Sequence, residues 1–244
     1  MELATVDRTA TVDGQTRHYR ETGPAGASPI IALHGHPGTA ETWDETARGL
    51  CAALGCRVLA VTARGYGASD RAASYAFADF AADVIGFADA VGLDRVVLLG
   101  HSMGGTVATL AAALQPERIT ALVLEDSVPP RDESEWPTPT RPDGELPYDW
   151  EITLAVVRQL ARPDPKWWAS LPLISAPTLV IGGGSTSHVP QQLLADAVET
   201  IPDARLVTLA GTGHSPHRTH TELFVATVVD FLREMPLVLP EHGH

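Results

Sequence analysis

Short runs of apolar residues recur along this chain of 244 residues and alternate with segments whose composition is typical of helices. The runs consist mainly of Val, Ile, Leu and Ala, as strands buried on both faces require. This alternation predicts an α/β fold, in which helices cover both faces of a parallel sheet. The runs that predict strands are residues 30–33, 58–61, 96–99, 121–124, 178–181 and 206–209.

The N-terminal part of the chain has a different pattern. Residues 4–22 predict a hairpin that turns at Asp13-Gly14, because Asp-Gly suits a two-residue turn between strands. Near the other end, the pattern again predicts helices and a strand. These elements are a helix after Val189-Pro190, a strand after Ala204 and an amphipathic helix at about residues 219–233.

Between residues 127 and 173 the alternation stops. This stretch holds nine of the chain's 19 prolines and four of its five tryptophans, with one helix-like segment at 151–161. Because proline removes donors from a sheet, we expect the stretch to form a small lid over one end of the sheet. The prediction is a single domain of residues 1–244 that carries this insertion.

The segment at residues 96–114 predicts a strand, a sharp turn and an Ala-rich helix in direct succession. The turn is Gly100-His101-Ser102-Met103-Gly104, a Gly-x-Ser-x-Gly pattern. A serine in this context is held exposed on a strained bend, where it can act as a nucleophile. The flanking glycines are needed because a tight strand-to-helix reversal leaves no room for Cβ atoms.

A serine nucleophile also requires two backbone donors where negative charge develops on the reacting group. The N–H of Met103, directly after the serine, is one candidate. The loop at residues 33–38, after the third predicted strand, offers the N–H of His36 as the second. Two alternatives remain: the loop is only a Gly/Pro turn, or the His36 side chain donates a proton to the substrate directly.

Several motifs stand in a fixed order along the chain: His34-Gly35-His36-Pro37-Gly38, Arg64-Gly65-Tyr66-Gly67-Ala68-Ser69-Asp70, Gly100-His101-Ser102-Met103-Gly104-Gly105, Pro116-Glu117-Arg118 and Gly213-His214. In this respect the chain resembles serine hydrolases with the α/β-hydrolase fold, of the esterase, lactonase and cofactor-free haloperoxidase type. The resemblance runs from about Pro29 to Leu232. It implies a mostly parallel eight-stranded sheet with helices on both faces.

In that family the catalytic residues follow the order Ser, acid, His. His214 fits the base, since it lies in a loop of small residues just after the last predicted strand. A base in this position takes the proton of the serine hydroxyl. His217 and His220 follow at three-residue steps; a metal pair is conceivable, but two surface histidines are the preferred interpretation.

The acid departs from the usual family pattern. Most members carry it after the seventh strand in a Gly-x-x-Asp-x-x-Val-Pro motif, and here Thr186 stands in that slot. The resemblance to members that place the acid at the end of the sixth strand, ten residues after the proline of Pro-Glu-Arg, leads from Pro116 to Asp126. Glu125 stands beside it. Neighbouring strand residues point to opposite faces, so only one of the two can face His214, and we favour Asp126.

A further possibility concerns this site. Asp126 only caps a turn in one alternative, and Ser102 then works with His214 as a dyad.

The serine at position 102 excludes the relatives that use an aspartate nucleophile, the haloalkane dehalogenases and epoxide hydrolases. The tryptophans of the insertion, Trp136, Trp150, Trp167 and Trp168, either line an apolar substrate pocket or fasten the lid to the core.

These features predict a hydrolase of a carboxylic ester or lactone with a small apolar or aromatic substrate. Ser102 attacks, His214 transfers the proton, Asp126 orients the imidazole, and the N–H groups of His36 and Met103 bind the oxyanion. The alternatives on the same fold are a carbon–carbon bond hydrolase, a cofactor-free oxygenase, or a receptor that binds a ligand without turnover. The natural substrate and the oligomeric state stay open.

The composition of the chain argues against some classes of binding partner. The formal net charge of −13 argues against nucleic acid or an anionic membrane surface, since both attract basic patches. No apolar stretch reaches 18 residues, and Met1-Glu2-Leu3-Ala4 has no features of a leader peptide, so we expect a cytoplasmic protein. Cys51 and Cys56 lack the ligand set of a zinc site and are expected as buried free thiols. We expect no cofactor and no metal.

Overall fold

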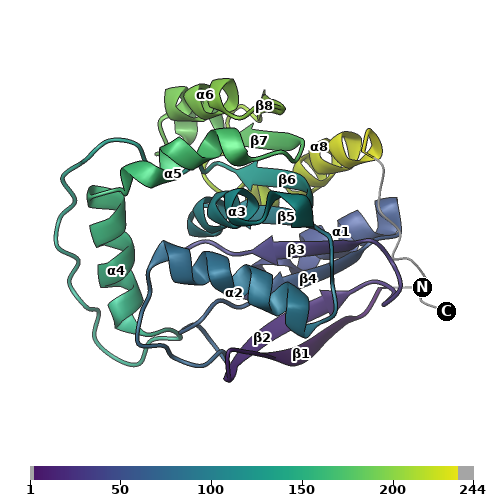
Figure 1. The fold of residues 1–244 in the computed structure, drawn as a ribbon, viewed down its shortest axis with the longest axis horizontal. Coiled ribbons are helices and arrows are strands. Elements are labelled where there is room, and N and C mark those ends of the chain that lie inside the picture. The colour runs from purple at the N-terminus through teal and green to yellow at the C-terminus, as the bar shows by residue number, and fades with distance from the viewer. Residues whose placement is uncertain (1–2, 236–244) are drawn as a thin grey trace.

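The computed structural model describes residues 3–235 and contains one eight-stranded sheet with the strand order β1-β2-β4-β3-β5-β6-β7-β8 (Figure 1). The pairs β1–β2 and β2–β4 are antiparallel, and all other neighbouring strands are parallel. The strands are β1 (Thr5–Val12), β2 (Gln15–Thr22), β3 (Pro29–Leu33), β4 (Arg57–Val61), β5 (Val96–His101), β6 (Ile119–Glu125), β7 (Thr178–Gly182) and β8 (Ala204–Thr208).

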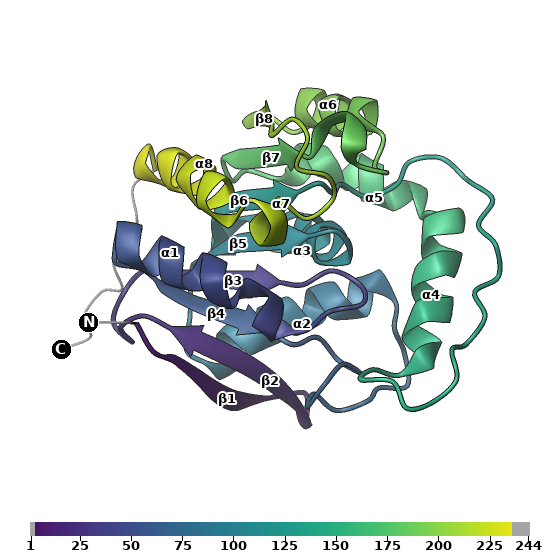
Figure 2. The same cartoon turned by 180° about the vertical axis from the view of Figure 1, so that it is seen from behind.

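Side chains of the central strands alternate between the two faces of the sheet. In β3, Ile31 and Leu33 belong to one apolar cluster, whereas Ile30 and Ala32 belong to the other. Both clusters are buried, and so the strands read as continuous apolar runs. The helices α2 (Phe77–Ala90), α3 (Met103–Leu114) and α6 (Gln191–Thr200) pack on the first face, and α1 (Asp44–Leu54) and α8 (Thr221–Arg233) pack on the second (Figures 1 and 2).

This arrangement confirms the predicted α/β-hydrolase fold, with a mostly parallel eight-stranded sheet and helices on both faces. The N-terminal hairpin also forms at the predicted turn. Asp13 and Gly14 both have positive φ, at 48° and 75°. A two-residue hairpin turn with positive φ at both positions matches the right-handed twist of the flanking strands.

The insertion between β6 and β7 contains two helices, α4 (Trp150–Ala161) and α5 (Pro165–Ser170). Figure 1 shows α4 at the left of the view, on the side of the molecule away from α1 and α8. The helix at 151–161 was predicted, but α5 was not. Its length of six residues is too short for a periodic apolar pattern, and it begins with an Asp164 cap that accepts the N–H of Lys166.

The insertion is fastened to the body of the protein near the start of α4. Tyr148 forms an isolated antiparallel bridge with Tyr66, and the N–H of Gly67 donates to the carbonyl of Pro147 at 2.7 Å. The hydroxyl of Tyr75 donates to Asp149 at 2.8 Å. These contacts attach the insertion to the loop that follows β4.

The amphipathic helix predicted at about residues 219–233 is α8 (Thr221–Arg233), and a separate short helix that was not predicted precedes it. A short helix, α7 (Pro216–Thr219), is followed by α8 after a break at His220, whose φ of −143° is not helical. Single-turn 3₁₀ helices occupy four further positions in the described residues: Ala40–Trp43, Pro116–Arg118, Leu171–Leu173 and Gly184–Thr186.

The structure also tests the expectations about membrane spans and free cysteines. Among residues 3–235, no helix has the length and apolar character needed to cross a bilayer. Part of the N-terminal segment considered for a leader, Met1 and Glu2, lies outside the described residues. Cys51 and Cys56 are both buried free thiols, as predicted.

Gly104 allows α3 to lie directly on β3, and its replacement tests this packing. A Cβ at this position would stand 2.3 Å from the carbonyl oxygen of Leu33, which is backbone and cannot move aside. We expect Gly104→Ala to lower the free energy of unfolding by about 1–3 kcal/mol or more, measured by urea denaturation. Gly26→Ala is the control, since a Cβ there meets no atom within 4 Å. Equal stability of the two variants would contradict the close approach.

Candidate active site

Ser102 lies at the turn between β5 and α3, with φ 53° and ψ −121°. A positive φ is rare for a residue with a side chain, so the turn is strained. The turn is tightly packed: a Cβ on Gly100 would stand 2.4 Å from the carbonyl oxygen of Gly104. A Cβ on Gly105 would stand 2.7 Å from the Cβ of Ser127. The glycines around Ser102 thus permit the sharp reversal.

Asp126 and His214 form a direct hydrogen bond. Nδ1 of His214 lies 2.8 Å from Oδ2 of Asp126. Asp126 directly follows β6, and the pairing of His101 with Glu125 sets the ends of β5 and β6 side by side. Ser102 and Asp126 therefore leave adjacent strands at the same edge of the sheet. His214 reaches this edge from the loop after β8.

The carboxylate of Asp126 is fully buried and accepts four hydrogen bonds. Besides His214, the donors are the N–H of Gly183 at 2.9 Å, the amide of Gln191 at 3.3 Å and the hydroxyl of Ser187. Burial raises the pKa of Asp126, but the hydrogen bonds from His214, Ser187, Gly183 and Gln191 outweigh it and leave the pKa below its ordinary value. The group is ionised and acts as an acceptor.

The loop after β7 supplies these donors in place of an acid. Sequence reasoning considered only Thr186 in this loop, which is exposed and whose hydroxyl lies 3.5 Å from the carbonyl oxygen of Gly183. It missed Ser187 and Gln191. The signal was available in the polar residues that flank Val189-Pro190, since a buried carboxylate needs several donors.

Glu125 points to the other face of the sheet, as the alternation of strand residues predicts. It is fully buried and accepts the backbone N–H of His217 at 2.7 Å and its Nδ1–H at 2.9 Å. Burial raises the pKa of Glu125 to about 7. The expectation that His217 is a surface histidine is therefore wrong: it is 2 % exposed, because the strand-end glutamate binds it. His220 is exposed.

Within residues 3–235, one group of side chains approaches a metal-binding arrangement. It consists of His101, Glu125 and His217, whose nearest ligand atoms lie within 4.8 Å of one another. In the structure these atoms make direct hydrogen bonds: His217 donates to Glu125, and Nε2 of His101 lies 2.8 Å from the carbonyl oxygen of His214. We therefore describe these residues by their contacts with protein groups: Glu125 pairs with His217, and His101 binds the backbone of His214.

The two candidate oxyanion donors both border Ser102. Met103 is the first residue of α3, and the first N–H groups of a helix have no partner within it. His36 lies in the loop after β3. A Cβ on Gly35 in this loop would stand 3.0 Å from Cβ of Ser102, so the loop is in contact with the serine. His36 and Met103 line the same cavity as Ser102.

The imidazole of His36 bonds to other protein groups through both nitrogens. Nδ1 lies 2.7 Å from the hydroxyl of Tyr66, and Nε2 lies 3.1 Å from that of Thr153 in α4. Burial lowers the pKa of His36 to about 4, so the ring is neutral. These bonds connect the loop after β3 to the insertion and give the side chain a structural role, which weakens the alternative of direct proton donation.

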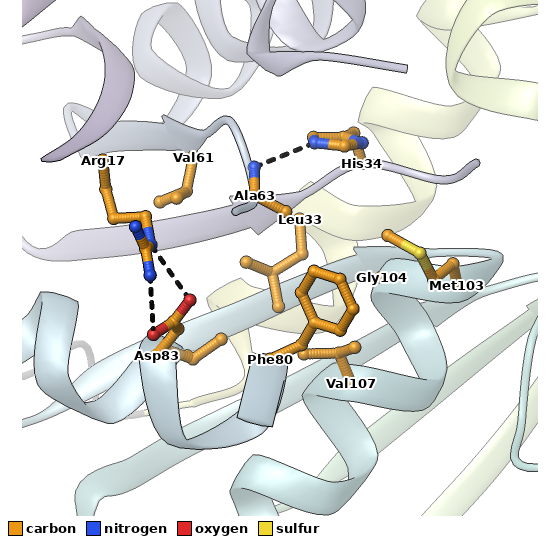
Figure 3. Close-up of a pocket in the computed structure, with 11 residues that line it drawn as sticks. Arg17, Leu33, His34, Val61, Ala63, Phe80, Asp83, Met103, Gly104 and Val107 are labelled. Atoms are coloured by element: carbon orange, nitrogen blue, oxygen red, sulfur yellow. Dashed lines mark hydrogen bonds and ion pairs between the residues drawn. The ribbon is translucent and has the colours of Figure 1, made fainter. Parts of the chain in front are cut away.

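A cavity of about 370 Å³ opens onto Ser102 and His214. Its other walls are mainly apolar and come from α2, α3, α4, α6 and the start of the insertion. The apolar lining residues are Phe77, Met103, Val128, Pro130, Trp136, Val156, Val157, Leu160, Val189, Pro190 and Leu193. A smaller cavity of about 30 Å³ lies beside β3, between the Arg17–Asp83 ion pair and Met103 (Figure 3). It has room for a water molecule and not for a substrate.

The four tryptophans of the insertion have different positions. Trp136 lines the larger cavity, whereas Trp150, Trp167 and Trp168 do not. Trp167 packs against Phe77 with ring centroids 5.4 Å apart and supports the wall from behind. The indole N–H of Trp168 donates to the carbonyl of Pro129 at 2.8 Å. The pocket interpretation applies to Trp136, and the fastening interpretation suits Trp167 and Trp168.

His188 is a further residue at this site that sequence reasoning did not single out. Its ring centroid lies 4.1 Å from that of His214, and it borders the larger cavity. Burial and the neighbouring His214 lower the pKa of His188. His188 stands two residues after the Thr186 slot, but nothing in its sequence context distinguishes it from a surface histidine.

The sheet topology and the serine turn together define an α/β hydrolase. Residues 28–155 match the profile of the alpha/beta hydrolase fold family, and the chain belongs to this family. A solved alpha/beta hydrolase fold protein from Chitinophaga pinensis superposes with a TM-score of 0.80 at 19% identity, over 94% of this chain and 98% of its own.

Related proteins carry several activities. A non-heme chloroperoxidase from Streptomyces lividans is 37% identical over 49% of this chain and 44% of its own length. Esterase YbfF from Escherichia coli is 26% identical over 85% of this chain and 94% of its own. A 2-hydroxy-6-oxononadienedioate/2-hydroxy-6-oxononatrienedioate hydrolase from Paraburkholderia phymatum is 29% identical over 95% of this chain and 96% of its own.

The acid position is open to a direct test. With Asn at position 126 the imidazole of His214 loses its anionic acceptor, and an equivalent change in the Ser-His-Asp protease template costs on the order of 10⁴ in turnover. We expect Asp126→Asn to lose activity on this scale in a p-nitrophenyl ester assay. Glu125→Gln, which keeps an acceptor for His217, should lose little, and Thr186→Ala should be nearly unchanged. Activity of Asp126→Asn within tenfold of the wild type would exclude Asp126 as the acid.

Proposed function

We propose that this protein hydrolyses a carboxylic ester or lactone through an acyl-enzyme intermediate. The observation that carries the proposal is the 2.8 Å hydrogen bond between Asp126 and Nδ1 of His214, beside a cavity that Ser102 also lines. Since Nδ1 donates to the carboxylate, Nε2 of the neutral ring holds the lone pair that a general base requires. The three residues thus supply a nucleophile, a base and an orienting acid.

The reaction proceeds in two halves. The hydroxyl oxygen of Ser102 bonds to the carbonyl carbon while His214 takes the hydroxyl proton, and the N–H groups of His36 and Met103 stabilise the oxyanion. The carbon–oxygen bond of the ester then breaks, and His214 gives its proton to the departing alcohol. Water attacks the acyl-serine, His214 takes a proton from it, and the acid leaves as Ser102 regains its proton. Asp126 stabilises the imidazolium that forms in each half.

The cavity favours an uncharged acyl group. Among its described lining residues there is no lysine or arginine, and most of its walls are apolar. A carboxylate carried far into such a cavity would be desolvated without a partner, which is costly. The cavity volume of about 370 Å³ lies in the lower range of small-molecule pockets. We therefore propose a small apolar or aromatic acyl group.

Two of the related proteins are named for activities other than ester hydrolysis. One relative of similar length is named for a dienedioate substrate, whose two carboxylates suit this cavity poorly for the reason just given. The chloroperoxidase matches only about half of this chain. The esterase relative, which aligns over most of both chains, agrees with the proposal. A panel of p-nitrophenyl esters, lactones and a keto-dienoate separates these activities directly.

Replacement of the nucleophile is the primary test. We expect Ser102→Ala to lower p-nitrophenyl butyrate hydrolysis by about three orders of magnitude or more with an unchanged melting temperature, because the bond-forming atom is lost and the change is small. A fluorophosphonate should label the wild type at Ser102, as mapped by mass spectrometry, and should not label the variant. Turnover retained in the folded variant would refute the proposal, as would a folded wild type that neither reacts with the probe nor hydrolyses any ester.

Trp136 tests the acyl pocket. Because it lines the cavity and is half exposed, Trp136→Ala should change the relative rates across acetate, butyrate and octanoate esters by about tenfold while the acetate rate changes little. Trp168→Ala is the matched control, since this residue of the same insertion does not line the cavity. Uniform losses on all three esters would show that Trp136 does not contact the acyl group.

A further inference from the structure

Two buried side chains stand directly before the proposed nucleophile and the proposed acid. His101 precedes Ser102, and Glu125 precedes Asp126. The two are register partners at the ends of β5 and β6, with exposed fractions of 8 % and 0 %. Neither lines the larger cavity. They therefore do not contact a substrate in that cavity. Both instead bind protein groups at and near His214.

His101 binds the loop that carries His214. Its Nε2 lies 2.8 Å from the backbone carbonyl oxygen of His214 and 3.3 Å from the hydroxyl oxygen of Ser215. A carbonyl oxygen only accepts, so Nε2 bears the proton. Burial lowers the pKa of His101 to about 4, and the ring is a neutral donor. His101 therefore fixes the backbone at the catalytic base itself.

Glu125 binds His217, which lies in α7 three residues after His214. Its Oε1 accepts the backbone N–H of His217 at 2.7 Å and the Nδ1–H of the same residue at 2.9 Å. The ring of His217 stacks on Trp43 at a centroid distance of 4.3 Å. The carbonyl of His217 accepts the hydroxyl of Thr221 at 2.8 Å. Position 217 is thus held through its backbone and its side chain.

The two contacts together determine where the imidazole of His214 stands. The loop lies over the sheet edge, and its backbone is held at the carbonyl of residue 214 and at the N–H of residue 217. Both holding side chains are the last residues of the strands that directly precede Ser102 and Asp126. The position of the base is therefore fixed by the same two strand ends that carry the nucleophile and the acid. His214 is nevertheless more than 85 residues away in sequence from either of them.

We propose that His101 and Glu125 are positioning residues, which hold the His214 loop in register with Ser102 and Asp126. This inference rests on the proposed function for the identity of the base. A displacement of a catalytic group by about 1 Å can cost on the order of 10²-fold in rate. Loss of either contact should therefore act on the chemical step and leave the acyl cavity intact.

Paired substitutions separate positioning from general structural effects. His101→Gln keeps an N–H near the place of Nε2, and Glu125→Gln keeps an acceptor. Both should stay within about tenfold of the wild type in kcat. His101→Leu and Glu125→Leu remove these groups and should lose about 10²-fold in kcat, with KM within a few-fold. The exposed His220 gives the control, His220→Gln, which should match the wild type.

Two readouts complete the experiment: the rate of fluorophosphonate labelling at Ser102, and hydrogen exchange of a peptide that spans residues 211–217. We expect slower labelling and faster exchange in both leucine variants. Because both contacts hold one loop, the double leucine variant should be less impaired than the product of the single effects predicts. Wild-type kcat and exchange in folded leucine variants would overturn the proposal, and so would equal losses in the leucine and glutamine variants.

Two further outcomes are distinguishable. If the wild type is not labelled and exchange still accelerates in the leucine variants, the proposed function fails and the positioning contacts stand. If His101→Leu does not fold, His101→Asn takes its place, because its shorter amide cannot reach the carbonyl of His214. This variant must then show the same loss of kcat at a normal melting temperature, and a wild-type kcat would overturn the proposal.

Discussion

The parallel register between β5 and β6 is the constraint on which the site depends. It sets His101 opposite Glu125, and the chain leaves the sheet at both strands one residue later. Ser102 and Asp126 both have positive φ at this point, 53° and 45°. Two strained residues on neighbouring strand ends persist because the surrounding packing determines them. The glycines around Ser102 allow this packing, since α3 would otherwise collide with β3 and with its own turn.

Much of this architecture could be predicted from sequence, because it follows from local patterns. The apolar runs mark buried strands, and Asp13-Gly14 marks a hairpin. The short helices α5 and α7 could not be predicted, since neither is long enough to show a period. His217 was misjudged for another reason. Its burial depends on a carboxylate 92 positions earlier in the chain, and no local pattern reports such a partner.

The candidate site shows the same division. The order of the motifs led to Ser102, Asp126 and His214 as a related set, and the structure brings the last two into contact. What sequence reasoning did not supply is the environment of Asp126. Ser187 comes from the loop after β7, in which the usual family pattern places the acid, and Gln191 is the first residue of α6; both donate to the carboxylate instead. This part of the chain thus contributes neutral donors to the site. Their hydrogen bonds offset the free-energy cost of burying the charged carboxylate.

The connection between the insertion and the nucleophile limits how the cavity can open. The hydroxyl of Ser127, the first residue of the insertion, donates to the carbonyl oxygen of Ser102 at 2.5 Å. At its other attachment, the insertion is fixed to the loop after β4 through Tyr148 and Asp149. Between these anchors, residues 131–145 are almost entirely exposed. A hinge at Ser127 would move the nucleophile's own backbone, so a movement of this exposed middle stretch disturbs the catalytic serine least when a large substrate enters.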